Sequence, residues 1–160
     1  MKIIISIIFL LSLTLFNFAY SSEYNAIVSK VTDGDSIHVI YKGNKLKIRL
    51  LYIDAPELKQ AYGMESKEFL ENIILNKTVT VSCAKKDFYG RELCEIFLYG
   101  SDTPTYINAK MIKSGNAWVY KSNRSNTYLI NLEKDAIYYK RGLWHSEDAI
   151  EPWAYRKLKK

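Results

Sequence analysis

Apolar and polar positions alternate in short segments through the first half of the chain. Residues 24–31, 36–41 and 46–53 are rich in β-branched and aromatic side chains, and Asp-Gly and Gly-Asn dipeptides stand between them. Such runs, bounded by Asp, Asn and Gly, are typical of antiparallel strands that are joined by tight turns. We therefore expect three consecutive strands in a meander.

The second half of the chain combines helical spacing with two further strands. Residues 63–75, 106–114 and 126–140 place apolar side chains three and four positions apart, which predicts three helices. Residues 78–83 and 93–98 have the composition of strands and flank the sequence DFYGR, which indicates a hairpin.

Five strands with one helix between the third and the fourth have the element order of an OB-type Greek-key barrel. The predicted fold class is therefore a five-stranded OB-fold barrel with about three α-helices. A mixed α+β sandwich is the alternative. The length of 160 residues favours one domain, and no repeat, low-complexity tract or linker divides residues 22–160.

The N-terminus has the organisation of a signal peptide. Lys2 precedes residues 3–18, which are almost all apolar, and the tripeptide AYS follows with small residues at alternate positions. This pattern predicts an export signal over residues 1–21. The mature domain, residues 22–160, is then periplasmic or secreted, with no stable membrane association after cleavage. An uncleaved anchor is the alternative, because about 17 apolar residues is the lower limit for spanning a bilayer.

The charge balance admits a polyanionic partner. The chain has 23 Lys and Arg against 17 Asp and Glu, which gives a formal net charge of +6 and a pI near 9.1. Positive charge attracts nucleic acid, anionic lipid and cell-wall polymer alike. A basic pI is also common in small exported proteins, so the charge does not select among these partners.

Charged residues flank the third predicted strand. Arg49 stands within it, Asp54 and Glu57 follow its apolar part, and Asp35 comes just before the second strand. Neighbouring strands of a meander can bring Asp35 and Asp54 together, and two carboxylates repel unless a cation or a proton lies between them. Carboxylate oxygens without converging His or Cys favour a hard cation, Ca²⁺ first and Mg²⁺ second. With Arg91 as further positive charge, an anionic substrate would complete the site.

Six motifs, in this order along the chain, resemble the staphylococcal-nuclease-like, or thermonuclease, family. They span essentially the whole mature chain, which makes the resemblance specific. The motifs are DGDS (33–36), RLLYIDAPE (49–57), YGME (62–65), DFYGR (87–91), SGNAWVY (114–120) and RGLW (141–144). The ending DAIEPWAYRK is similar to that of exported bacterial members.

The resemblance implies a calcium-dependent phosphodiesterase on an OB-fold barrel. Such an enzyme would cut DNA and RNA without sequence preference and leave 3′-phosphate ends. It implies that Asp35 and Asp54 supply carboxylates to Ca²⁺ and that Ala55 supplies a main-chain carbonyl. Alanine suits the last position because a backbone oxygen does the binding.

The resemblance also implies the catalytic residues. Arg49 and Arg91 would bind the scissile phosphate, for which a bidentate guanidinium is better suited than an ammonium group. Glu57 would take a proton from the attacking water, or at least orient it. The expected aromatic contacts to the nucleotide are Tyr89, Trp118 and Tyr120. Core packing is the alternative role for Trp118.

Two cysteines lie at equal distances from the centre of the predicted hairpin turn. Cys83 and Cys94 would therefore face each other across the ladder. An exported chain with two cysteines favours their oxidation. We expect a disulfide between them.

Two non-enzymatic classes of protein are alternatives to a nuclease. One is a catalytically inactive OB-fold module that binds nucleic acid, and the other is a basic surface-interaction protein. An inactive relative would be expected to lack some of the carboxylates or arginines, and a surface-binding protein would need no paired carboxylates. All five charged positions are filled here, which favours a hydrolase with DNA and RNA as substrates. We expect the protein to be a monomer.

Overall fold

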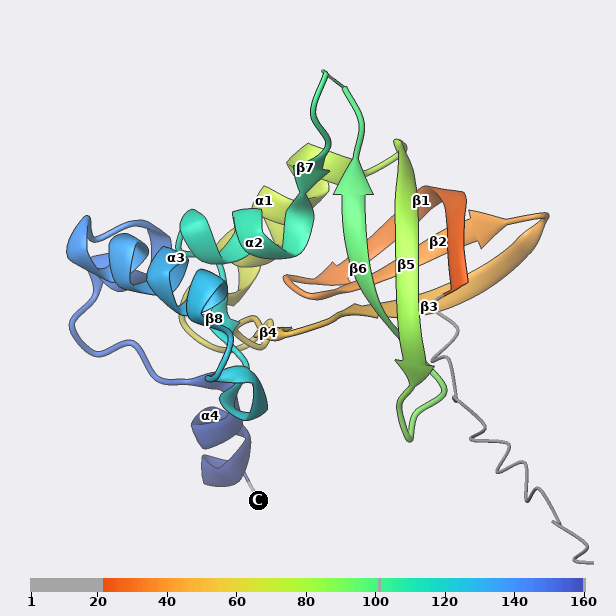
Figure 1. Ribbon diagram of the computed structural model, residues 1–160. Coiled ribbons are helices and arrows are strands. Elements are labelled where there is room, and N and C mark those ends of the chain that lie inside the picture. The colour runs from red at the N-terminus through yellow and green to blue at the C-terminus, as the bar shows by residue number, and fades with distance from the viewer. Residues whose placement is uncertain (1–21, 101, 160) are drawn as a thin grey trace, which may run out of the picture.

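Five long strands close into a barrel in the computed structural model, which describes residues 22–100 and 102–159 (Figure 1). Their order is β3-β2-β1-β5-β6, and parallel pairing of β3 with β6 closes the barrel. This confirms the predicted five-stranded OB-type fold. The predicted signal sequence, residues 1–21, lies outside the described residues. The barrel strands are β1 (Ser22–Asp33), β2 (Ser36–Tyr41), β3 (Asn44–Leu50), β5 (Thr78–Lys86) and β6 (Glu92–Leu98).

The helices lie outside the barrel, and Figure 1 shows α2, α3 and α4 on one side of it. No helix within the described ranges is both long and apolar enough to cross a bilayer. The short strands are β4 (Ile53–Asp54), β7 (Thr105–Tyr106) and β8 (Trp118–Val119). The helices are α1 (Gly63–Ile74), α2 (Ile107–Lys113), α3 (Thr127–Tyr138) and α4 (Pro152–Leu158), with 3₁₀ turns η1 (Lys121–Asn123) and η2 (Gly142–His145).

The three predicted helices are present, and α4 is additional. Its seven residues, PWAYRKL, are too few to show an apolar period. Pro152 at its first position is a helix-start signal, because the fixed φ of proline fits the first turn and its missing N–H costs nothing there.

The third predicted strand is interrupted. Strand β3 ends at Leu50, and Tyr52 has a φ of 69°, a left-handed conformation that turns the chain out of the barrel. The chain then forms β4, which pairs with β8 rather than with the barrel. This bend moves Asp54 out of the barrel sheet.

A buried asparagine ties helix α2 to the line where the barrel closes. Asn108 has no exposed surface. Its Oδ1 accepts from the N–H of Ile96 at 3.0 Å, and its Nδ2 donates to the carbonyls of Leu51 at 2.9 Å and Cys94 at 3.2 Å. These bonds supply hydrogen-bond partners to buried backbone groups where β3 and β6 meet.

The predicted disulfide is present. Cys83 and Cys94 are paired residues of β5 and β6, and their sulfur atoms are bonded. The bond joins the two strands just before the turn of residues 87–91. It therefore holds the base of the hairpin that carries Arg91.

Candidate active site

A cleft of about 480 Å³ opens where the β1–β2 turn, the segment after β4, the β5–β6 hairpin and α4 meet. Carboxylates, guanidinium groups and tyrosines dominate its lining. These residues are Asp33, Asp35, Glu57, Asp87, Arg49, Arg91, Arg156, Tyr89 and Tyr120. The cleft thus brings together most of the residues that the sequence motifs predict for the site.

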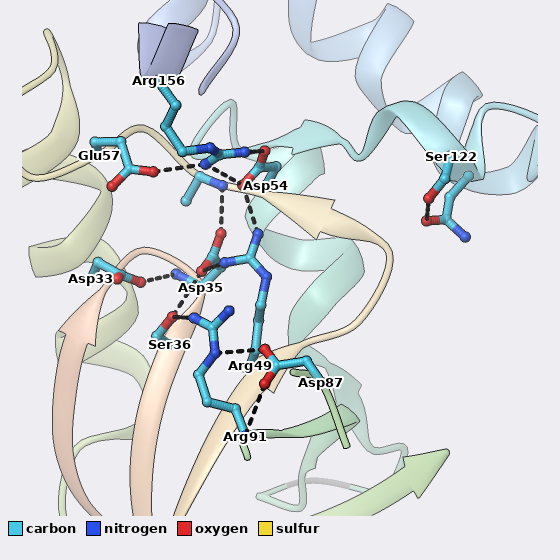
Figure 2. A network of polar contacts seen from close by, with 12 residues as sticks. Asp33, Asp35, Ser36, Arg49, Asp54, Glu57, Asp87, Arg91, Ser122 and Arg156 are labelled. Carbon is cyan, nitrogen blue, oxygen red and sulfur yellow. Dashed lines mark hydrogen bonds and ion pairs between the residues drawn. The ribbon is translucent and has the colours of Figure 1, made fainter. Parts of the chain in front are cut away.

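One guanidinium joins the two predicted metal-binding aspartates (Figure 2). Arg49 donates from Nη1 to Oδ1 of Asp35 at 2.5 Å and from Nη2 to Oδ1 of Asp54 at 2.6 Å. Asp54 is fully buried and Asp35 is 3% exposed. A buried carboxylate is costly unless it is paired, so Arg49 allows both to stay close together.

Local hydrogen bonds fix the orientation of Asp35. Its Oδ1 accepts from the hydroxyl of Ser36 at 3.0 Å, and its Oδ2 accepts from the N–H of Ala55 at 2.8 Å. The Asp33 carboxylate accepts from the N–H of Asp35 at 3.0 Å, which stabilises the turn between β1 and β2. The carboxylate is therefore held against the backbone that follows β4.

Burial also changes the acidity of Asp35. Burial raises the pKa of Asp35 to about 7, although the positive charge of Arg49 opposes the rise. The nearby carboxylates of Asp33 and Asp54 act in the same direction as burial. The negative charge on Asp35 is therefore easily neutralised by a proton or by a further cation.

Arg91 lies at the closed end of the β5–β6 hairpin. Its Nε donates to Oδ2 of Asp87 at 2.8 Å, and the same aspartate accepts from the N–H groups of Tyr89 and Arg91 at 2.9 and 3.0 Å. Although burial opposes it, these bonds lower the pKa of Asp87. The hairpin thus presents Arg91 to the cleft, with the guanidinium 5.6 Å from the ring centroid of the exposed Tyr89.

Glu57 and Asp54 share a partner that the sequence motifs did not indicate. Arg156 of α4 donates to Oε1 of Glu57 at 2.7 Å and to Oδ2 of Asp54 at 2.6 Å. Although burial disfavours its charge, the two carboxylates raise the pKa of Arg156. Only the proline at the start of α4 marked this segment as helical, and nothing in its sequence indicated that Arg156 reaches the cleft.

Trp118 is placed differently from the other predicted site residues. It is 5% exposed, packs edge-on against Trp144 with ring centroids 5.2 Å apart, and does not line the cleft. It faces a second, apolar cavity of about 640 Å³ instead. Tyr120, two residues on, does line the cleft.

The carboxylates of the cleft outnumber its guanidinium groups, and one divalent cation would balance the excess negative charge. Four carboxylates and three guanidinium groups line the cleft, and with the buried Asp54 the carboxylates exceed the guanidinium groups by two. The donors are oxygens, as hard cations prefer. The guanidinium groups of Arg49 and Arg156 lie between three of these carboxylates, those of Asp35, Asp54 and Glu57. The donor set fits Ca²⁺ or Mg²⁺.

The model of the family described as staphylococcal nuclease homologue matches residues 47–146, well over half of the chain. The chain belongs to the staphylococcal nuclease family. This membership confirms the family predicted from the motifs and, with it, the class of enzyme, a hydrolase of the nuclease type. Arg49, Asp54, Glu57 and Arg91 lie within the matched residues, whereas Asp35 precedes them.

Individual members of the staphylococcal nuclease family are similar over most of their length. A protein of Escherichia coli O157:H7 named "Uncharacterized endonuclease" is 37% identical over 150 residues, which cover 92% of this chain and 96% of the relative. A protein of the same name from Haemophilus influenzae is 36% identical over 144 residues, 89% of this chain and 79% of the relative. A "Micrococcal nuclease" of Shigella flexneri is 32% identical over 146 residues, 87% and 84% of the two chains.

Proposed function

We propose that this chain is a calcium-dependent endonuclease that hydrolyses phosphodiester bonds of DNA and RNA without sequence preference. The observation that carries the proposal is the cleft in which one guanidinium, that of Arg49, joins Asp35 to Asp54, with Glu57 and Arg91 in the same lining. The names of the relatives, "endonuclease" and "Micrococcal nuclease", support the same activity. The proposed products carry 3′-phosphate ends.

The metal ligands we propose are the carboxylates of Asp35 and Asp54 and the main-chain carbonyl of Ala55. The N–H of Ala55 donates to Asp35, so this backbone lies directly beside the first carboxylate. Bound there, Ca²⁺ would supply positive charge to the oxygens of the scissile phosphate. The excess of carboxylates in the cleft supports a divalent cation.

Arg49 and Arg91 are the proposed phosphate-binding residues. A phosphodiester carries one negative charge, and more charge develops on its oxygens as water attacks. Guanidinium groups that are already held in place stabilise this added charge without a cost of reorganisation. Arg49 is held by two aspartates and Arg91 by Asp87, so both are fixed before substrate binds. Each guanidinium has five N–H groups, so donors remain for the phosphate.

Glu57 is the proposed proton acceptor. Its carboxylate lines the cleft and its side chain is 41% exposed, so water can reach it. A carboxylate near the attacking water can accept the proton that the water loses as the new P–O bond forms.

Tyr89 and Tyr120 are the proposed contacts to the bases. Tyr89 is 77% exposed at the tip of the hairpin, and both side chains line the cleft. Stacking of bases on aromatic rings tolerates any sequence, as a non-specific nuclease requires. We propose that Trp118 contributes by packing beneath this segment rather than by touching the nucleotide, since it is buried against Trp144.

We further propose that the protein is exported as a monomer after loss of residues 1–21. The disulfide between Cys83 and Cys94 supports an oxidising compartment, because such bonds rarely persist in a reducing cytosol. Intact-mass measurement of the exported protein tests the loss of the signal sequence.

Digestion of supercoiled plasmid and of unstructured RNA tests the proposed activity. Cleavage of both is expected with Ca²⁺, much weaker cleavage with Mg²⁺, and none with a chelator, because Mg²⁺ demands a smaller and stricter octahedral shell. Removal of the product ends by a 3′-phosphatase identifies the end group. An inactive binding module would retard DNA on a gel and leave it intact.

A further inference from the structure

The C-terminal helix places a third arginine against the carboxylates of the cleft (Figure 2). Nη1 of Arg156 lies 2.7 Å from Oε1 of Glu57 and 3.2 Å from Oδ1 of Asp54, and Nη2 lies 2.6 Å from Oδ2 of Asp54. One guanidinium therefore binds both oxygens of the buried Asp54 and one oxygen of the half-exposed Glu57. The family match ends at residue 146, so it does not include this arginine.

The segment that carries Glu57 is held by the C-terminal residues at two further points. The side-chain nitrogen Nε2 of Gln60 donates to the carbonyl of Ile150 at 2.5 Å, and its side-chain oxygen Oε1 accepts from the N–H of Glu57 at 3.1 Å. The hydroxyl of Tyr155 donates to the carbonyl of Lys59 at 2.8 Å. The C-terminal segment thus packs on the loop that follows β4.

We infer that Arg156 is a positioning residue for Glu57, an inference that rests on the proposed nuclease function. An exposed glutamate samples several rotamers, and holding one of them has an entropic cost. An isolated surface ion pair would do little to hold it. Arg156 differs because both its terminal nitrogens bind Asp54, which is itself fully buried and bound to Arg49. The guanidinium is fixed on one side and orients Glu57 on the other.

Loss of Arg156 should affect turnover and cation affinity differently, whereas loss of a residue with a purely structural role should impair both together. Without Arg156, Glu57 loses its orienting donor, so proton transfer should become slower. The cleft also loses one positive charge beside Asp54, so a divalent cation should bind at least as tightly as before, because like charges repel at short range. Slower turnover with undiminished cation affinity is the expected signature.

The test compares Arg156→Gln and Arg156→Lys with Lys157→Gln, which removes an exposed positive charge from the same helix. Arg156→Gln should lower kcat on plasmid DNA by about 10–100-fold, the usual effect of losing a group that orients a catalytic residue. KM for DNA should change by less than about 3-fold, as expected when an interaction acts on the chemical step. Arg156→Lys should recover part of kcat, and Lys157→Gln should match the wild type.

The second readout is calcium affinity, measured by titration calorimetry without nucleic acid. Arg156→Gln should bind Ca²⁺ as tightly as the wild type or more tightly. Combined with Glu57→Gln, it should lower kcat by less than about 3-fold further, because two residues that act as a unit are not additive. Wild-type kcat in Arg156→Gln, a higher KM alone, weaker calcium binding, or full additivity with Glu57→Gln would each overturn the inference. Absence of cleavage by the wild type would instead overturn the proposed function.

Discussion

A β-carbon added to Gly34 would lie 2.0 Å from Oγ of Ser66 and 2.7 Å from Cβ of Ala55. Ser66 is in the first turn of α1, where its hydroxyl donates to the carbonyl of Asn116 at 2.7 Å. The turn between β1 and β2 therefore packs directly on the helix and on the side chain of Ala55, which follows β4. This close approach brings the carboxylate of Asp35 to the N–H of Ala55.

Gly34→Ala should destabilise the fold by roughly 1–3 kcal/mol, the usual cost of overpacking a filled site. It should also reduce nuclease activity, because Asp35 has to move with the turn. Gly100→Ala is the matched control, since an added β-carbon there meets no atom within 4 Å. Denaturant unfolding of both variants measures the difference. Equal stability of the two would contradict the packing described here.

The raised pKa of Asp35 predicts how stability depends on pH. The folded protein holds the proton up to about pH 7, whereas an ordinary aspartate loses it near 3.8. The folded state therefore binds protons more tightly than the unfolded state between these values, and stability should fall as the pH rises from about 4 to 7.

Asp35→Asn has no proton to lose at this position. It should match the wild type near pH 4 and exceed its stability at pH 8 by on the order of 1–3 kcal/mol. Thermal unfolding across this pH range, in chelator so that no cation competes with the proton, measures the difference. A variant that is less stable than the wild type at pH 8 would show that the charge of Asp35 stabilises the fold.

Arg49→Lys should be nearly inactive although it keeps the positive charge. The guanidinium reaches Asp35 and Asp54 through two different nitrogens, and a single ammonium group cannot reproduce that planar arrangement. We expect kcat/KM to fall by about 10²–10³-fold, as for other losses of a preorganised donor. Arg124→Lys, at the ion pair with Glu133 on α3, is the matched control. Similar activity of the two variants in plasmid digestion would rule out a specific role for the Arg49 guanidinium.

The disulfide should stabilise the protein without taking part in the chemistry. Cys83 and Cys94 are 11 residues apart, and closing a loop of this size adds on the order of 2–3 kcal/mol. A Cys83→Ser/Cys94→Ser variant should melt roughly 5–10 °C lower and keep its activity at 25 °C. Two free thiols in the denatured, unreduced wild type would show that the bond does not form in solution.

Features that depend on strand period and turn length could be predicted from the sequence. Alternation and turn dipeptides predicted the barrel strands, and the meander pairing places Ser36, the neighbour of Asp35, opposite Arg49. The symmetry of Cys83 and Cys94 about the hairpin turn predicted their pairing. Each of these relations follows from strand period and turn length, which operate over short distances along the chain.

Other features depended on tertiary contacts that leave no local signal. Tyr52 adopts a positive φ that tyrosine rarely takes, so the bend between β3 and β4 was missed. Arg156 reaches Glu57 across 99 residues, from a helix too short to show a period. Trp118 matched an aromatic position of the family motif, yet its side chain is buried against Trp144.

Glu57→Gln tests whether this carboxylate accepts the proton of the attacking water, because the substitution removes the proposed acceptor and keeps the shape of the side chain. The measurement is kcat on plasmid DNA with saturating Ca²⁺, together with DNA binding and calcium affinity of the same variant. We predict that kcat falls by roughly 10²–10⁴-fold, the usual contribution of a positioned acid or base, while both affinities stay near wild type. The control is Glu68→Gln on the exposed face of α1, which should cut DNA like the wild type. Undiminished kcat in Glu57→Gln, or full wild-type cleavage in the presence of chelator, would rule out the calcium-dependent mechanism with Glu57 as proton acceptor.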